Sequence, residues 1–273
     1  MNKQNEEEPA IMIREVWAFN LDSEFSLIRQ LVPHYRFVSM DTEFPGVIYT
    51  PKVDYRSLQP SDHYRYLKAN VDALKLIQLG LTLTDANGNL PRVDSNYCIW
   101  QFNFREFDVE HDPHNQDSIQ MLQRQGIDLP RNFLHGVDSL RFADLMLKSG
   151  LVLNTSVVWV TFHSAYDFGY LVKTLIRRDL PDTLQEFLGT LTILFGNNVY
   201  DMKHMMKFCN SLYGGLDRVA TTLNVCRVAG KSHQAGSDSL LTWLAFKKMV
   251  DTYFINNEVQ KHAGKLFGLE IAA

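Results

Sequence analysis

The sequence has little cysteine and lacks any long uninterrupted run of apolar residues. Its 273 residues include three cysteines, an odd number, and no two of them form a CxxC pair. This argues against a disulfide framework and against a thiolate zinc site. We expect Cys98, Cys209 and Cys226 to be reduced and buried. Because no apolar run approaches the roughly 20 residues of a membrane-spanning helix, we expect no membrane partner.

A surplus of positive charge is also lacking. The chain carries 27 lysines and arginines against 31 aspartates and glutamates, for a formal net charge of −4. This argues against a protein that holds nucleic acid on a broad basic surface. It does not exclude a nuclease built around clustered carboxylates, which can hold a short single strand through bound cations and a few stacking contacts.

The chain shows no internal repeat and no low-complexity linker. Residues 1–10 are polar and acidic and lack the apolar segment of a signal peptide, and we expect a flexible leader there, followed by one domain over 11–273. Apolar residues make up 45% of the chain and charged residues 21%, a globular composition. We expect a soluble intracellular protein of the cytoplasm, and the sequence leaves a nuclear pool open.

The order of predicted elements indicates an α/β fold. Extended apolar segments predict strands at 13–19, 36–40, 76–85, 97–104 and 156–162. Apolar residues at helical spacing predict helices at 22–31, 62–73, 118–124, 138–148, 163–175, 181–194, 202–211, 215–223 and 237–253. The first of these helices follows the cap-like pair Asp22 and Ser23. Strand, helix and hairpin followed by strand and helix predict a central sheet with helices on both faces.

The segment Asp41-Thr42-Glu43 is the sharpest chemical feature. It follows a predicted strand, and alternating positions of an extended segment point to one side, so both carboxylates can face the same point. Two adjacent anions repel and need a cation unless one is protonated, and their hard oxygen atoms suit magnesium or manganese rather than zinc. Taken alone, the motif favours two exposed acids beside a turn.

Two later segments offer further acids. Asp167 stands where the strand at 156–162 passes into a helix, and ligand sites of open α/β sheets lie at such carboxyl ends. A helix cap is the alternative. His233 stands in a predicted loop five residues before Asp238, which begins the last long helix. A capping aspartate beside a surface histidine is the alternative there.

Together, these elements resemble the motifs of the DEDD exonucleases in their histidine-containing branch. The similarity extends to the deadenylase family that associates with the carbon catabolite repressor and the NOT scaffold. Seven segments from about Ile13 to near the carboxyl terminus carry it: MDTEFPG, LKLIQLGLTL, IWQFNFREF, TFHSAYDFGYL, YDMKHMMKFC, LYGGLDRVA and HQAGSDSLLT. Asp144 in RFADLM stands where the resemblance leads us to expect a longer acid.

The resemblance implies a ribonuclease-H-like fold, a mixed sheet with helices on both faces, and hydrolytic release of 5′-AMP from the 3′ end of poly(A). It implies that Asp41, Glu43, Asp167 and Asp238 hold two divalent cations, Mg²⁺ or Mn²⁺. His233 would be the general base. The implied substrate is single-stranded RNA with a poly(A) tail. The implied partners are a NOT-type scaffold protein and a leucine-rich-repeat nuclease subunit.

Other residues near these motifs have a structural reading beside the functional one. Phe44 would stack on a terminal base or pack beside Pro45. Asp201 would be an additional site acid or, as we favour, the N-cap of a helix. Solvated or structural roles are expected for four further side chains: His163, Lys203, His204 and Arg227.

Two alternatives to a poly(A) nuclease stay open. One is a DEDD exonuclease with a broader preference for RNA or single-stranded DNA, because the metal motifs do not encode the base. The other is a catalytically silent scaffold subunit, against which the presence of all four carboxylates and the histidine argues.

Overall fold

The central feature of the fold is one mixed sheet. The computed structural model describes residues 10–54 and 57–271, so the predicted leader lies, except for Ala10, outside the described residues. The strands are β1 (Ile11–Val16), β2 (Phe37–Glu43), β3 (Gln78–Thr84), β4 (Arg92–Val93), β5 (Asn96–Asn103), β6 (Val158–Thr161) and β7 (Val199–Asp201). Their order is β1-β5-β3-β2-β6-β7, with β4 paired to β5. β2 lies inside the sheet, antiparallel to β3 and parallel to β6.

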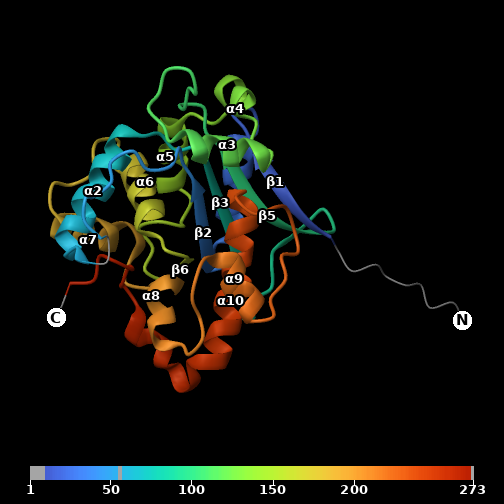
Figure 1. Cartoon of the computed structure of the whole chain (residues 1–273). Helices are drawn as coiled ribbons and strands as arrows, with labels where there is room; N and C mark the ends of the chain where they lie inside the picture. Colours follow the sequence, from blue (N-terminus) through green and yellow to red (C-terminus); the bar gives the residue numbers. More distant parts are fainter. Residues whose placement is uncertain (1–9, 55–56, 272–273) are drawn as a thin grey trace, which may run out of the picture.

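Helices cover both faces of this sheet. They are α1 (Leu21–Leu31), α2 (Pro60–Ala73), α3 (Gln116–Arg124), α4 (Leu129–His135), α5 (Ser139–Leu147), α6 (Ala165–Ile176), α7 (Leu184–Phe195), α8 (Met202–Met205), α9 (Leu216–Thr222) and α10 (Ala235–Tyr253), with 3-10 turns at Met206–Phe208 and Ile255–His262. Figure 1 shows α2, α6 and α7 on one side of the sheet and α10, with α9 beside it, on the other. The predicted mixed α/β sheet is confirmed.

Each face of the sheet has its own apolar core. On the side of α6, buried aromatic rings pack together, among them Phe25 and Phe142 with centroids 5.4 Å apart. On the side of α10, the core includes Met202, Trp243 and Met249. Burial of apolar side chains on both faces of the sheet stabilises the register of the strands. No helix of the described ranges is long and apolar enough to cross a bilayer.

Several local predictions are wrong. Helix α1 begins after Asn20, because Leu21 is already buried in the core, so Asp22 and Ser23 lie in the first turn and do not cap it. The helix predicted at 202–211 is limited to α8 and a 3-10 turn, and β7 and α4 were not predicted. Cys226 is exposed in the loop after α9, whereas Cys98 and Cys209 are buried.

Candidate active site

Strand β2 carries the first two acids to the middle of the sheet. Asp41 and Glu43 are the third-last and last residues of the strand, so both side chains emerge on the same face. The side chain of Glu43 is buried and that of Asp41 half-buried. The expected placement at the carboxyl end of a strand is confirmed.

Helix α10 reaches these acids because β3 has a glycine opposite Asp41. Gly80 pairs with Asp41 in the β2–β3 register. A Cβ atom at Gly80 would lie 1.9 Å from the carbonyl oxygen of Ala235, the first residue of α10. Glycine therefore permits contact between the start of the helix and the strand backbone. Asp238, in the first turn of α10, is thereby brought beside β2.

Buried amide side chains hold the start of α10 in this position. The first N–H groups of a helix have no partner within the helix. Here Gln101 Oε1 accepts a hydrogen bond from the backbone N–H of Gly236 at 2.9 Å, and Gln78 Oε1 accepts a longer one from Ala235 at 3.4 Å. Both glutamines are almost fully buried. These two glutamines, from β3 and β5, thus fix where the start of α10, and with it Asp238, contacts the sheet.

Asp167 comes from the first turn of α6 and is tied to β2. One carboxylate oxygen of Asp167 accepts hydrogen bonds from the Thr42 backbone N–H at 2.8 Å and from the Thr42 hydroxyl at 2.6 Å. Because Thr42 lies between the two acids of β2, this pair of bonds sets the third carboxylate beside them. Asp167 is not the N-cap of α6, a position held by Ser164.

Asp201 supports the site through backbone hydrogen bonds and is not one of the grouped carboxylates. Its fully buried carboxylate accepts hydrogen bonds from the backbone N–H groups of His163, Lys203 and Phe267 at 2.8 to 2.9 Å. The bond from Lys203 is the expected N-cap of α8, which is confirmed. The bond from His163 fixes the connection between β6 and α6, and thus the start of the helix that carries Asp167.

His233 lies in the loop before α10, with a positive φ of 59°. Its backbone N–H donates to Asp238 Oδ2 at 2.9 Å, which fixes the loop on the helix. Its side chain is exposed. One potential ligand atom from each of Glu43, His233 and Asp238 lies within 4.8 Å of the others. The predicted histidine therefore faces the acids, from the solvent side.

The acids raise one another's pKa. Burial raises the pKa values of Asp41 and Glu43 well above their usual range, and the carboxylates of Asp238 and Asp167 raise them further. Burial also raises the pKa of Asp167, to about 7, against the opposing effect of the Thr42 hydrogen bonds. The pKa of Asp238 is raised by burial and lowered in part by Arg227.

This donor set fits divalent cations. Four carboxylates of the described chain lie close enough to disfavour one another's ionisation, and such a group is stabilised when cations supply the opposite charge. The ligand atoms are oxygens with one imidazole nearby, as hard cations such as Mg²⁺ and Mn²⁺ prefer.

Phe44 packs against the helix that carries Asp167. Its ring stacks on Tyr166 with centroids 5.2 Å apart and lies 4.9 Å from Tyr170. The packing role that we considered for Phe44 is therefore present. Its ring also stays partly exposed next to Glu43, so a base could stack beside it.

The remaining motif residues lie outside the carboxylate group, with one exception. Lys203 donates to the carbonyl of Gly214, and His204 pairs with Glu270 at 2.8 Å. Arg227 is the exception, because its guanidinium contacts Asp238 and is mostly buried, contrary to the solvated role we expected. No periodicity or motif signal marks this contact in the sequence.

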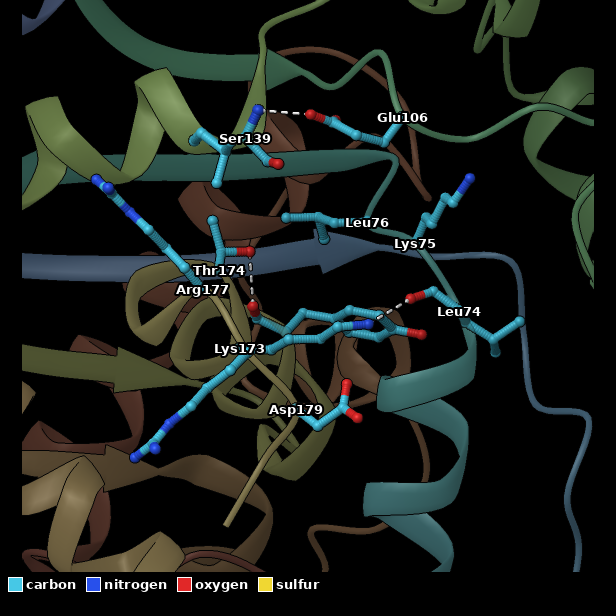
Figure 2. Close-up of a pocket in the computed structure, with 12 residues that line it drawn as sticks. Leu74, Lys75, Leu76, Glu106, Ser139, Lys173, Thr174, Arg177 and Asp179 are labelled. Atoms are coloured by element: carbon cyan, nitrogen blue, oxygen red, sulfur yellow. Dashed lines mark hydrogen bonds between the residues drawn. The ribbon is translucent and has the colours of Figure 1, made fainter.

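Asp144 has no part in the site. Its exposed carboxylate pairs with Arg177 at the far end of α6. Figure 2 shows the pocket of about 260 Å³ beside that part of α6, where Lys173 donates to the carbonyl of Leu74 at 3.2 Å. Lys173 also donates to the carbonyls of Val71 and Asp72, so it ties α6 to the end of α2. This pocket contains none of the predicted site residues.

Comparisons with known proteins give one consistent result. A model described as CAF1 family ribonuclease matches residues 16–145. The probable CCR4-associated factor 1 homolog 7 of Arabidopsis thaliana is 52% identical over 264 residues, which cover 96% of this chain and 94% of that protein. The poly(A) ribonuclease pop2 of Schizosaccharomyces pombe is 43% identical over 94% of this chain and 75% of its own length.

Solved structures agree. The S. pombe Pop2p structure with bound Mg²⁺ and Mn²⁺ superposes with a TM-score of 0.87 at 42% identity, over 94% of this chain and 99% of that one. Yeast CAF1 crystallised with the NOT1 MIF4G domain gives a TM-score of 0.76 at 34% identity, over 94% and 96% of the two chains. Escherichia coli exonuclease I, at 14% identity and a TM-score of 0.53 over 80% of this chain and 41% of that one, shares the fold alone.

Proposed function

Because the chain belongs to the CAF1 family of ribonucleases, we propose that it is a deadenylase, a 3′-to-5′ exoribonuclease that shortens the poly(A) tails of messenger RNA and releases 5′-AMP. One observation carries the proposal. Glu43, Asp238 and the exposed His233 offer ligand atoms within 4.8 Å of one another. Asp167 lies near enough to raise the pKa of both Asp41 and Glu43. The relative whose name states a poly(A) ribonuclease activity is 43% identical over nearly the whole chain.

The acids hold the catalytic cations. Two divalent ions, Mg²⁺ or Mn²⁺, would be bound by Asp41, Glu43, Asp167 and Asp238. The related Pop2p structure contains Mg²⁺ and Mn²⁺. When bound, such a pair activates a water molecule and stabilises the departing 3′ oxygen. The protein supplies the fixed arrangement: Thr42 orients Asp167, and the buried glutamines of β3 and β5 orient the start of α10.

His233 moves the proton. Its side chain lies on the solvent side of the acids, where it can take the proton of the attacking water. The water oxygen bonds to the phosphorus of the last phosphodiester, and the bond from that phosphorus to the 3′ oxygen of the preceding nucleotide breaks. The departing 3′ oxygen takes up a proton from the solvent. The products are 5′-AMP and a tail one nucleotide shorter. Phe44, next to Glu43, would stack on the terminal base.

A relative supports one partner protein, and the sequence resemblance alone implies a second. A CAF1 relative 34% identical to this chain was crystallised with a NOT1 MIF4G domain, which supports docking on a NOT-type scaffold. We also propose a leucine-rich-repeat nuclease as a second partner. Copurification from cells of the source organism should recover both proteins. A chain that is free of the scaffold in every fraction would count against docking.

A degradation assay tests the activity. The purified chain should shorten a tailed RNA in Mg²⁺ or Mn²⁺ and release 5′-AMP, and EDTA should stop the reaction. Comparison of poly(A), poly(U) and oligo(dA) measures base and sugar preference, and similar rates on all three would favour the broader exonuclease. No degradation with either metal would favour the silent scaffold subunit instead.

A further inference from the structure

The loop that carries His233 is fastened by an ion-pair bridge that includes Arg227 and Asp217. Arg227 lies between α9 and α10, and its Nη1 contacts Asp238 Oδ1 at 2.5 Å and Ser237 Oγ at 2.7 Å. Its Nη2 donates to Asp217 Oδ1, at the start of α9, at 2.6 Å. One guanidinium therefore joins α9 to the first turn of α10.

Asp217 uses its second oxygen on the same loop. Asp217 Oδ2 accepts a hydrogen bond from the hydroxyl of Ser232 at 2.7 Å, and Ser232 directly precedes His233. The backbone N–H of His233 in turn donates to Asp238 Oδ2 at 2.9 Å. The contacts thus run from Ser232 through Asp217 and Arg227 to Asp238, which in turn binds the backbone of His233.

The bridge leaves Asp238 facing the other site residues. With Arg227 on one oxygen and the His233 N–H on the other, an Asp238 oxygen still lies within 4.8 Å of ligand atoms of Glu43 and His233. Each carboxylate oxygen has two lone pairs, so these two bonds leave acceptor capacity for a cation. The contact orients the carboxylate and does not close the site.

A cation beside a metal site would ordinarily weaken metal binding. Here Arg227 also pairs with Asp217, which accepts from Nη2 while Asp238 accepts from Nη1. The pair is neutral as a unit. Arg227 still lowers the pKa of Asp238 and of Asp41, but Asp217 limits how far its charge opposes a bound cation. The Arg227 side chain is 17% exposed, whereas that of Asp217 is 59% exposed. The contact between Arg227 and Asp238 is therefore less exposed to solvent than the contact between Arg227 and Asp217.

We propose that Arg227 and Asp217 are positioning residues of the metal centre, which set Asp238 and the His233 loop in their binding geometry. The inference rests on the proposed metal centre. Outer partners of metal ligands typically contribute roughly 10- to 100-fold to metal affinity or activity. We expect Asp217→Asn to weaken Mn²⁺ binding by about tenfold, and Arg227→Gln by as much or more.

The test is a Mn²⁺ titration of the intact protein without RNA, with free Mn²⁺ followed by electron paramagnetic resonance. Asp22→Asn is the matched control, because Asp22 is also exposed, at 63%, and pairs with Arg141 between α1 and α5. It should bind Mn²⁺ as the wild type does. Arg227→Lys keeps the charge but lacks the fork that reaches both carboxylates, and it should fall between wild type and Arg227→Gln.

Two further readouts separate positioning from a long-range charge effect and from a defect in the chemical step. A deficit from Asp217→Asn that persists from about 0.05 to about 0.5 M KCl supports positioning, because long-range charge effects at an exposed site are screened by salt. A deficit that vanishes at the higher salt overturns it. Excess Mn²⁺ should restore turnover to Asp217→Asn if the defect lies in metal binding, and a variant that excess Mn²⁺ leaves slow contradicts the proposal.

Arg227→Gln that binds Mn²⁺ as tightly as the wild type, or more tightly, would show that Arg227 only competes with the metal for Asp238. Wild-type affinity in Asp217→Asn would equally refute the proposal. These failures differ from a failure of the proposed function, in which the wild type itself would bind no Mn²⁺ and degrade no RNA.

Discussion

Replacement of Asp167 by asparagine should stabilise the metal-free protein at alkaline pH. Burial raises the pKa of Asp167 from 3.8 to about 7. The folded chain then binds more protons than the unfolded chain between about pH 4 and pH 7, so the free energy of unfolding falls as pH rises through that window. Above pH 7 the full cost is present, roughly 4 kcal/mol at about 1.4 kcal/mol for each pH unit.

Asparagine removes this cost and keeps most of the contacts. Its carbonyl oxygen can still accept the bonds that Thr42 now donates to Asp167 at 2.8 and 2.6 Å. Those bonds are weaker to a neutral acceptor, so we expect a net gain of roughly 2 to 4 kcal/mol at pH 8. At pH 5 the aspartate is largely protonated in the folded chain, and the gain should shrink to about 1 kcal/mol.

Urea unfolding in EDTA at pH 8 and at pH 5, followed by tryptophan fluorescence, measures both values. Asp144→Asn is the control, because Asp144 is exposed and its pKa is lowered by Arg177, so its replacement should give no gain at pH 8. Addition of Mg²⁺ at pH 8 should stabilise the wild type more than Asp167→Asn. An Asp167→Asn chain that is less stable than the wild type at pH 8, or a difference that is independent of pH, would refute the reasoning.

Four other substitutions have defined outcomes. Asp41→Ala should abolish metal-dependent degradation of poly(A) while circular dichroism stays native, because a metal ligand is lost; degradation at the wild-type rate would contradict this. His233→Ala should lower kcat roughly 10²- to 10⁴-fold on a short oligo(A) at saturating metal between pH 6 and 9; a loss under about threefold would identify a surface histidine. Gly80→Ala should cost roughly 1 to 3 kcal/mol and most of the activity, because its Cβ would meet Ala235 at 1.9 Å. Gly189→Ala, in the exposed interior of α7 with no heavy atom within 4 Å of the new Cβ, should be neutral or stabilising.

The parts of the fold that the sequence predicted are those with a long local pattern. The β3–β5 hairpin and the helix after β6 follow from long runs with one periodicity, and the strand that leads to Asp41 follows from the apolar segment 36–40. Because three of the four carboxylates stand at ends of such elements, their convergence could be anticipated. The fourth, Asp238, required the resemblance, since nothing local says where a helix start will dock.

The elements that were missed are short or depend on distant partners. Strand β7 has three residues, too few for an alternating pattern, and it pairs with β6 although α6 and α7 lie between the two strands in the chain. The contact between Arg227 and Asp238 joins a loop to a helix start, where no period exists to reveal it. Gly80 did leave a signal, because a glycine inside an apolar strand often marks a close backbone approach.

The buried polar residues around α10 show why one region serves both stability and catalysis. Ser39 donates to the carbonyl of Ser239 at 2.7 Å, and the Thr82 and Ser239 hydroxyls lie 2.9 Å apart, so β2 and β3 bind the helix through polar groups inside an apolar core. Buried polar groups are costly without partners, so the pairing of the Ser39, Thr82 and Ser239 hydroxyls favours this docking of α10 over alternative packings. The same contacts that specify the docking of α10 therefore hold Asp238 near acids that repel it. The repulsion stays in the folded chain until cations bind, so metal affinity and the instability of the metal-free protein have a common origin.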